Sequence, residues 1–424
     1  MEPFIKFFIE VGKLKTVRRP GWVLRGIKNP ETVADHAFRV LILAWVFGRE
    51  THLNIKRLLK LALVHSLSAA YIDYISPYGK LLEYKNKKDL LQKYPALILR
   101  ASVTKKGKVA ALRFEEEKKA VDNLTRDLPE TTRHEIRYLW LDFQNKISKE
   151  AKFLKVLDRI ENLIQALEYK DQLSQELVSP FLSQINEVTD DKQILNFANS
   201  INTFFIKGEH AVKSRKNKNL IKFFIEVGKL KTIPRKGWVI RGVENPESIA
   251  AHSFVAALMS WILSIRRRID QEGVIVMSAS HDFFAVRKGD ATPYDHILRK
   301  TTDIKKIVET SPWTGPKGEK ELIAKRRLER EARELDRLIK PLPQTIRHEL
   351  KFFWLEYKTG TSREGRYARQ IDRVETLLQA IEYQKKDKSI SIISFWLELK
   401  ELLDDPVLSQ LVKEIDLYYY GRSS

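Results

Sequence analysis

Four side chains in the second half of the sequence have the types and the order that a metal site requires. His281 and Asp282 are adjacent in SASHDFFAVRKGDATP, His252 lies upstream and Asp372 lies far downstream. Together they offer two imidazole nitrogens and two carboxylate oxygens, which suits a divalent transition metal with positions left open for water and a phosphate. A His-Asp pair by itself is also typical of a buried core histidine beside a cap or a surface acid. The other two residues favour the metal site.

The segments that carry these residues occur twice in the chain. IKFFIEVGKLKT occupies residues 5–16 and again 221–232, and RRPGWVLRGIKNPETVADHAF and LDRIENLIQALEY in the first copy match PRKGWVIRGVENPESIAAHSF and IDRVETLLQAIEY in the second. A repeat of this length predicts two similar domains, which we place at residues 1–215 and 216–424. The polar stretch KGEHAVKSRKNKN between them is the expected linker.

Apolar residues recur at helical spacing in both copies and few segments alternate with a period of two, so the sequence predicts an all-α fold. In the first copy we expect helices over residues 33–50, 55–72, 114–127 and 150–169, and another that ends near residue 143. Asn29–Glu31 and Asn245–Glu247 are interpreted as helix starts, with Asn as N-cap and Pro at the first helical position. We place His281-Asp282 on a buried helix.

The charge of the chain favours an anionic partner. Lys and Arg number 76 against 55 acids among 424 residues, a net charge of +21. Such an excess is typical of proteins that bind nucleotides, nucleic acid or acidic surfaces. The basic runs KSRKNKN, RRR and AKRRLERE are interpreted first as solvated faces and linker, with nucleic-acid contact as the alternative.

Composition also excludes several classes of protein. The chain has no cysteine, which excludes a disulfide framework and thiolate chemistry. No apolar stretch is long enough to cross a membrane, so we expect no membrane partner. The N-terminus MEPFIKFFIEVGKLK lacks the features of a signal peptide, so we expect a cytoplasmic protein.

Four motifs in the same order resemble the HD-domain 5'-deoxynucleotidases. They are Gly-Trp-Val-x-Arg, Asn-Pro-Glu-Ser/Thr-Val/Ile-Ala-x-His, Leu-Val-His, and Asp-Arg-x-Glu-x-Leu-x-Gln-Ala-x-Glu-Tyr. The resemblance covers most of both copies. It implies an all-α fold, one divalent metal in a His…His-Asp…Asp set, and removal of phosphate from deoxynucleoside monophosphates. Because the family forms homodimers, the tandem chain resembles a dimer joined into one polypeptide, and we expect a monomer with an internal pseudo-dimer.

In the second copy the resemblance implies a complete metal-ligand set. The implied ligands are His252, His281, Asp282 and Asp372. The family's glutamate four positions after the second His, which helps to activate water, is Ala285 here. The family's second catalytic aspartate corresponds to Asp290, and its phosphate- and sugar-binding residues resemble Arg235 and Trp238.

In the first copy the set is degenerate. His36, His65 and Asp158 remain, but Ser66 stands where the metal aspartate belongs. Ala69 replaces the glutamate, and Tyr74 replaces the second aspartate, with Asp73 displaced by one position. Two carboxylates balance a divalent ion, whereas one carboxylate leaves a net charge of +1 in a desolvated pocket. We therefore expect one metal per chain (Mn, Co, Fe, Ni or Zn), bound in the second copy.

Trp22 and Trp238 each precede an arginine by three residues, Arg25 and Arg241. Each pair suits a nucleotide clamp, with the ring for stacking and the guanidinium for phosphate. A core tryptophan beside a surface arginine is an equally good interpretation.

The sequence as a whole predicts two tandem HD-domain helical bundles. The leading functional hypothesis is a metal-dependent phosphohydrolase that acts on nucleoside monophosphates, or a related phosphate ester, through the second copy. The first copy is then a structural or regulatory half. The alternative is a non-catalytic HD-fold protein that binds RNA, DNA or a ribonucleoprotein through its basic surface.

Overall fold

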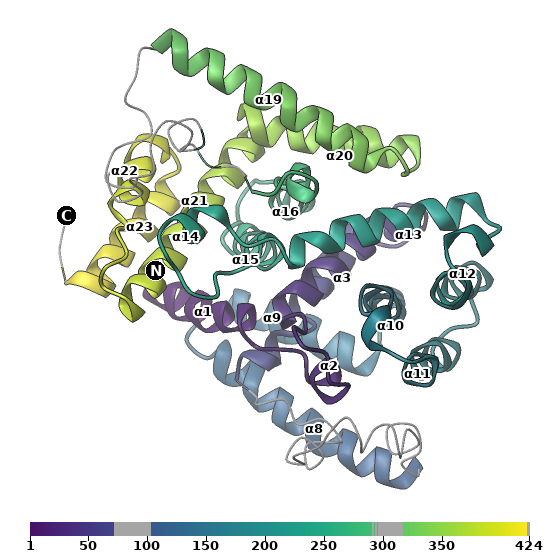
Figure 1. Ribbon diagram of the computed structural model, residues 1–424. Coiled ribbons are helices and arrows are strands. Elements are labelled where there is room, and N and C mark those ends of the chain that lie inside the picture. The colour runs from purple at the N-terminus through teal and green to yellow at the C-terminus, as the bar shows by residue number, and fades with distance from the viewer. Residues whose placement is uncertain (72–102, 291, 293–294, 296–316, 422–424) are drawn as a thin grey trace. The chain divides into compact units, whose positions relative to one another are not determined.

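The computed structural model describes residues 1–71, 103–290, 292, 295 and 317–421 (Figure 1). Within these residues the chain is helical, and its only β-pairing consists of two isolated bridges, Arg18 with Thr32 and Pro234 with Ser248. The predicted all-α fold is therefore confirmed.

The chain forms two compact units, each built mainly from one repeat. The His252 unit comprises Met1–Gly12 and Lys229–Ser424, and the His36 unit comprises Lys13–Gly228. The first helix of each repeat, α1 (Glu2–Gly12) or α13 (Arg215–Gly228), therefore belongs to the unit built from the other repeat. The predicted domain boundary near residue 216 lies inside α13. It stays a prediction about where the first repeat ends and the second begins.

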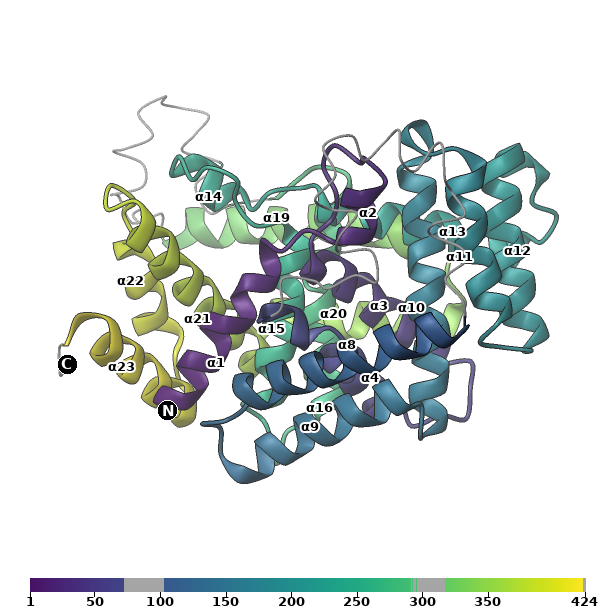
Figure 2. The same cartoon turned by 90° about the horizontal axis from the view of Figure 1, so that it is seen from below.

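The His36 unit consists of helices around the buried helix α3. Every residue of α3 (Val33–Gly48) is buried, and α10 packs along it. The views agree that α10, α11 and α12 lie side by side, and Figure 2 shows α9 running along α8. The other elements are η1 (Lys13–Lys15), α2 (Pro20–Leu24), α4 (Ile55–Val64), η2 (Leu67–Ala70), α8 (Val103–Leu124), α9 (Glu130–Asn145), α10 (Lys149–Glu168), η3 (Lys170–Gln172), α11 (Gln175–Asn186), α12 (Lys192–Lys207), η4 (Glu209–Ala211) and α13.

Helix α13 is held in this unit by aromatic packing and by one close approach. The ring of Phe224 stacks on Phe47 of α3 with 5.8 Å between centroids. At the end of α13, a Cβ on Gly228 would lie only 2.0 Å from the carboxylate of Glu168, which pairs with Arg39. Glycine lets the backbone approach this partly buried ion pair.

The His252 unit has the same plan around α15. All residues of α15 (Ile249–Ile262) are buried, and it packs on α16 and α21. Helix α1 contacts α15 and α23 and buries Ile5, Phe7, Phe8 and Val11. The other elements are η5 (Lys229–Lys231), α14 (Lys236–Ile240), α16 (Gln271–Ser280), η6 (Phe283–Val286), α19 (Lys317–Ile339), α20 (Gln344–Thr359), α21 (Arg363–Lys386), α22 (Ile393–Leu402) and α23 (Pro406–Tyr420).

The predicted helix starts at Asn29 and Asn245 are wrong, because each helix begins about three residues later. Thr32 is the N-cap of α3 and forms a capping box with Asp35, and Ser248 caps α15. These hydroxyls accept from backbone N–H groups that would otherwise lack partners. Asn245 has a φ of 50°, and its repeat partner Asn29 likewise precedes the helix.

The helix predicted to carry His281 and Asp282 ends just before them. α16 stops at Ser280, His281 is its C-cap, and Asp282 leads into the 3₁₀ turn η6. In the first repeat α4 likewise ends at Val64, so the predicted helix over residues 55–72 is too long. Adjacent side chains on an α-helix point about 100° apart, so they do not face the same centre. The turn after α16 lets His281 and Asp282 do so.

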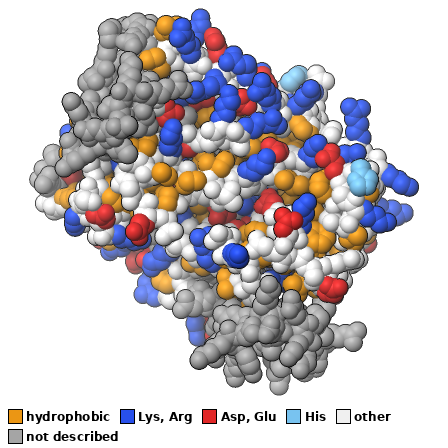
Figure 3. All heavy atoms as spheres, viewed as in Figure 1, with side chains coloured by type: hydrophobic (Ala, Val, Ile, Leu, Met, Phe, Trp, Pro, Cys, Tyr) orange, Lys and Arg blue, Asp and Glu red, His pale blue; other side chains and the backbone are white. Residues whose placement is uncertain are grey.

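The basic surface of α19 carries ion pairs. Figure 3 shows Lys and Arg side chains gathered over this helix with acids among them. Arg327 bonds to Glu331 at 2.6 Å, and Arg337 bonds to Glu334 at 2.9 Å. Within the run AKRRLERE, Lys325, Arg326 and Glu329 are exposed, as expected for a solvated helical face, whereas Glu331 is buried. Among the described residues, no helix is both long and apolar enough to cross a membrane.

Candidate metal centre

Three helices bring the four predicted ligand residues of the second repeat together inside the His252 unit. α15 supplies His252, the end of α16 supplies His281 and Asp282, and α21 supplies Asp372. His252 Nε2 lies 2.9 Å from Asp372 Oδ1, and His281 Nε2 lies 3.1 Å from Asp282 Oδ2 and 3.9 Å from Asp372 Oδ1. All four residues are buried. The structure thus brings together the residues that the sequence assigned to a metal.

Bonds on the outer side of each ligand fix which atom faces the centre. His252 Nδ1 lies 2.5 Å from the carboxylate of Glu375, and His281 Nδ1 donates to the carbonyl of Ser278 at 2.8 Å. A carbonyl only accepts, so Nδ1 carries a proton and Nε2 is the ring nitrogen left to bind a metal. This buried Nε2 has no hydrogen-bond partner in the described structure. Such an orphaned acceptor beside two carboxylates fits a metal ligand.

Asp372 is oriented in the same way. Its Oδ2 accepts bonds from the Tyr357 hydroxyl at 2.5 Å and from Arg373 at 2.7 Å, which leaves Oδ1 directed at the two imidazoles. Burial alone would raise the pKa of Asp372, but the positive charge of Arg373 and the bond to His252 hold it well below its usual range. The carboxylate is therefore charged and available as a ligand at neutral pH.

Arg235 brings a fixed positive charge to the edge of the centre. It donates to Asp282 Oδ2 at 3.1 Å and to the hydroxyl of Thr376 at 3.3 Å. Despite its burial, which raises the pKa of a carboxyl, Asp282 has a lowered pKa because His281 and Arg235 lie beside it. A guanidinium in this position suits contact with a phosphate oxygen.

Asp290, the predicted catalytic residue, lies in the loop after η6. Its Oδ2 accepts from the backbone N–H of Lys236 at 2.8 Å, and its charge contributes to the raised pKa of the neighbouring Arg235. This bond joins the loop to the start of α14, next to Arg235. The catalytic role of Asp290 stays a prediction.

Trp238 and Arg241 have the contacts of a structural pair. Trp238 is 1% exposed, and its indole N–H donates to Glu247 at 2.8 Å. Arg241 bonds to the carbonyl of Ser391 and the hydroxyl of Ser394, and lies 4.4 Å from the Phe395 ring. These contacts favour the core interpretation over the nucleotide clamp. A substrate contact by these two residues remains untested.

Sequence reasoning missed the buried acids that support the histidines. Glu375 and Glu161 each follow the ligand aspartate by three residues and lie 2.5 Å from the Nδ1 of His252 and His36. Glu247 likewise accepts from Trp238. The signal that could have found the first two is the Asp-Arg-x-Glu spacing, which puts Asp and Glu on one helical face.

The equivalent residues converge in the His36 unit, but with different charges. His36 Nε2 lies 3.1 Å from Asp158 Oδ1 and 3.5 Å from His65 Nε2, and Ser66 replaces the second carboxylate. Burial lowers the pKa of His65 to about 4. Lys155 Nζ lies 4.0 Å from Asp158 Oδ2. Three ligand atoms remain within reach of one ion, but with a single carboxylate and an ammonium nearby. Asp73 and Tyr74 lie outside the described residues.

Comparison with known proteins assigns both repeats to one family. Residues 11–199 and 227–400 match the HD domain family. The chain belongs to this family. It is 33% identical over 168 residues to 5'-deoxynucleotidase HDDC2 of Mus musculus, which covers 39% of this chain and 70% of that protein. The match to the Homo sapiens protein of the same name has the same identity and covers 39% of this chain and 68% of that protein. 5'-deoxynucleotidase YGK1 of Saccharomyces cerevisiae is 30% identical over 42% of this chain and 72% of its own length.

The two family matches confirm the predicted HD-domain tandem, and the relatives support a metal-dependent phosphohydrolase. Each match spans 39–42% of the chain, about the length of one repeat. The buried His and carboxylate residues of both repeats form candidate metal-binding groups, and they lie within the segments that match the HD domain family.

Proposed function

We propose that the protein is a metal-dependent phosphohydrolase that removes phosphate from nucleoside monophosphates, or from a related phosphate ester, at the second repeat. The observation that carries the proposal is the convergence of two imidazoles and two carboxylates around the orphaned Nε2 of His281. The relatives named 5'-deoxynucleotidase support nucleotides as the substrate class.

The residues present would hold one divalent ion per chain through His252, His281, Asp282 and Asp372. When bound, such an ion polarises a phosphoryl oxygen and lowers the pKa of water to near 7. The chain's own contribution is the orientation of these ligands by Glu375, Ser278, Tyr357 and Arg373.

Arg235 and Asp290 would act on the substrate from the edge of the site. The Arg235 guanidinium, fixed beside Asp282, would bind a phosphate oxygen with a charge-assisted hydrogen bond. Asp290, held by the N–H of Lys236, would accept a proton from the attacking water.

The residue at the position of the family's glutamate lowers the expected rate of hydrolysis, because it is an alanine. Ala285 is fully buried in η6 and has no group that can accept a proton. Loss of a positioned base typically costs about 10²–10⁴ in rate. We therefore propose a slow enzyme, in which Asp290 is the remaining base.

A phosphate-release screen tests the proposal. The purified full chain is given Mn²⁺ or Co²⁺ and a panel of ribo- and deoxyribonucleoside monophosphates. We expect phosphate release from one or more of them that stops when excess EDTA is added. If no nucleotide is turned over above the EDTA control, the proposed function is wrong.

A further inference from the structure

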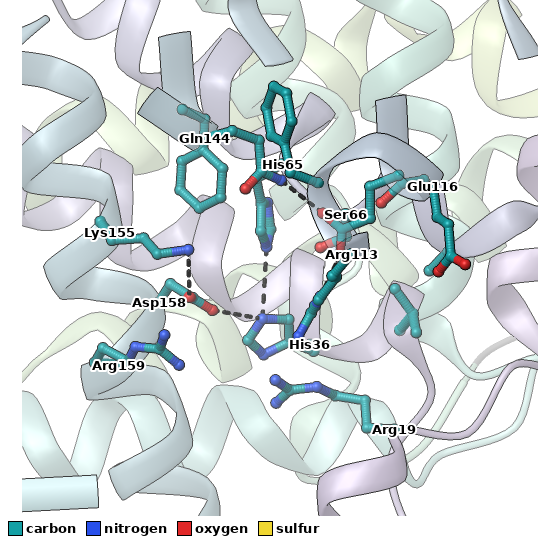
Figure 4. A pocket seen from close by; sticks show the side chains of 16 residues that line it. Arg19, His36, His65, Ser66, Arg113, Glu116, Gln144, Lys155, Asp158 and Arg159 are labelled. Atoms are coloured by element: carbon teal, nitrogen blue, oxygen red, sulfur yellow. Dashed lines mark hydrogen bonds and ion pairs between the residues drawn. The ribbon is translucent and has the colours of Figure 1, made fainter. Parts of the chain in front are cut away.

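The His36 unit keeps a cavity where the second repeat has its metal site. The cavity has a volume of about 280 Å³. Figure 4 shows His36, His65 and Ser66 in it, with Arg19, Lys155 and Arg159 around Asp158. A pocket of this size is just below the roughly 300–1,000 Å³ typical of sites for drug-sized ligands, which leaves room for a smaller anion.

Two of the cations come from successive turns of α10. Lys155 and Arg159 are four residues apart and therefore lie on one face of the helix. Lys155 Nζ lies 4.0 Å from Asp158 Oδ2 and 4.4 Å from the centre of the Phe143 ring. In Figure 4 the guanidinium of Arg19 faces His36 from the other side.

The second repeat uses the same positions differently. Arg373, the counterpart of Arg159, bonds to Asp372 and to Glu398 of α22. Arg159 has no hydrogen bond or ion pair to any residue of the described structure. The counterpart of Lys155 is Arg369. The first repeat thus lacks the second carboxylate, and Arg159 acts on Asp158 through its charge, lowering the pKa of that carboxyl, without a direct bond.

The acids that line the cavity are already engaged or exposed. Asp158 accepts from His36 and faces Lys155. Glu117 accepts bonds from Arg113 and Gln144, and Glu116 is exposed. Among the described residues, Asp158 is thus the one cavity acid that faces both Lys155 and Arg159, so this side of the cavity keeps an excess of positive charge.

We propose that this cavity binds a phosphate dianion, free or as a monoester, without a metal. Lys155 and Arg159 supply the positive charge that a metal would otherwise supply, and the hydroxyl of Ser66 is a neutral donor in the same cavity. Ser66 is not a strong metal ligand, but its hydroxyl donates well to a phosphate oxygen. The first repeat is then a ligand-binding site in its own right. This inference does not depend on catalysis by the second repeat.

Calorimetric titration of the full chain in excess EDTA tests the inference. One sample is titrated with inorganic phosphate and another with AMP. We expect one site per chain for at least one of the two. Tighter binding of AMP assigns the site to a monoester, and equal or tighter binding of inorganic phosphate assigns it to the free ion.

Matched variants place the site in the first repeat. Lys155→Met keeps the aliphatic chain but removes the charge, and should weaken binding roughly tenfold or more. Arg369→Met makes the corresponding change in the second repeat and should leave the affinity as in the wild type. Arg159→Gln provides a second variant if Lys155→Met lowers the thermal unfolding midpoint so far that it cannot be titrated.

Three results would overturn the inference. They are no binding of either ligand at millimolar concentration, wild-type affinity in the Lys155→Met or Arg159→Gln protein, and loss of binding in the Arg369→Met protein.

Discussion

Replacing Asp282 by serine would give the second repeat the residue that the first repeat has at the same place, Ser66. Asp282 Oδ2 lies 3.1 Å from His281 Nε2, so its carboxylate is placed to share an ion with that imidazole. The substitution removes one of two negative charges and leaves Asp372 with two imidazoles, which bind an ion only in their neutral form. A bound divalent ion would then keep a net charge of +1 in a buried site.

The size of the effect follows from the charge that is lost. A carboxylate oxygen binds a divalent ion at about 2.1 Å. At an effective dielectric constant of about 20, the attraction between a unit charge and even a singly charged ion at this distance is several kcal/mol. Desolvation offsets part of this, and each 1.4 kcal/mol that remains is about tenfold in affinity. We expect a loss on the order of 10³-fold, which empties the site at micromolar protein.

Elemental analysis by mass spectrometry after dialysis measures the metal content directly. We expect about one metal per chain for the wild type and none for Asp282→Ser. His65→Ala should leave the count unchanged, and Ser66→Asp should raise it towards two by completing the first set. A wild-type count near two, or metal that survives Asp282→Ser, would refute the reasoning that one carboxylate separates the repeats.

Three further predictions concern rate and stability. Ala285→Glu restores a base and should raise the rate of phosphate release. An unchanged rate in a folded, metal-loaded variant would contradict the assignment of residue 285 to the position of the family's glutamate. Asp290→Asn should lower kcat by about 10²–10⁴ without changing metal content, and kcat within twofold of the wild type would exclude it as the base. Asp142→Asn should cost roughly 1–3 kcal/mol of unfolding free energy at pH 7, because this buried carboxylate accepts from Ser148 and Arg57. These bonds outweigh burial and lower the pKa of Asp142, so its contribution is present above the unfolded pKa and lost as pH falls through the folded one. Denaturant titrations should therefore show the gap to wild type closing below about pH 4, and a gap that persists there would contradict this linkage.

The convergence of the four candidate ligand residues could be predicted from the sequence because they lie in short, recognisable motifs, and their role as metal ligands stays a prediction. The two repeats also provided an internal comparison that marked Ser66 against Asp282. The supporting residues were harder to predict, since Tyr357 reaches Asp372 from a different helix. Such a contact depends on how helices pack, which no local pattern specifies.

The helix boundaries failed for local reasons. Asn-Pro-Glu has the composition of a helix start, but Thr32 and Ser248 offer a better cap because their hydroxyls accept from the third residue of the helix. The exchange of α1 and α13 between the units could not be predicted, because IKFFIEVGKLKT is identical in both. Either copy presents the same apolar face, so the sequence does not distinguish the two arrangements.

The claim that the second repeat carries the reaction is tested most directly by a matched pair of histidine variants. His281→Ala and His65→Ala remove the same side chain from the two repeats. With Mn²⁺ or Co²⁺ and a nucleoside monophosphate that the wild type hydrolyses, His281→Ala should show no phosphate release above the EDTA control. His65→Ala should keep kcat/KM within about twofold of the wild type, since His65 lies outside the proposed ligand set. Activity that survives His281→Ala, or is lost in His65→Ala, would contradict the assignment.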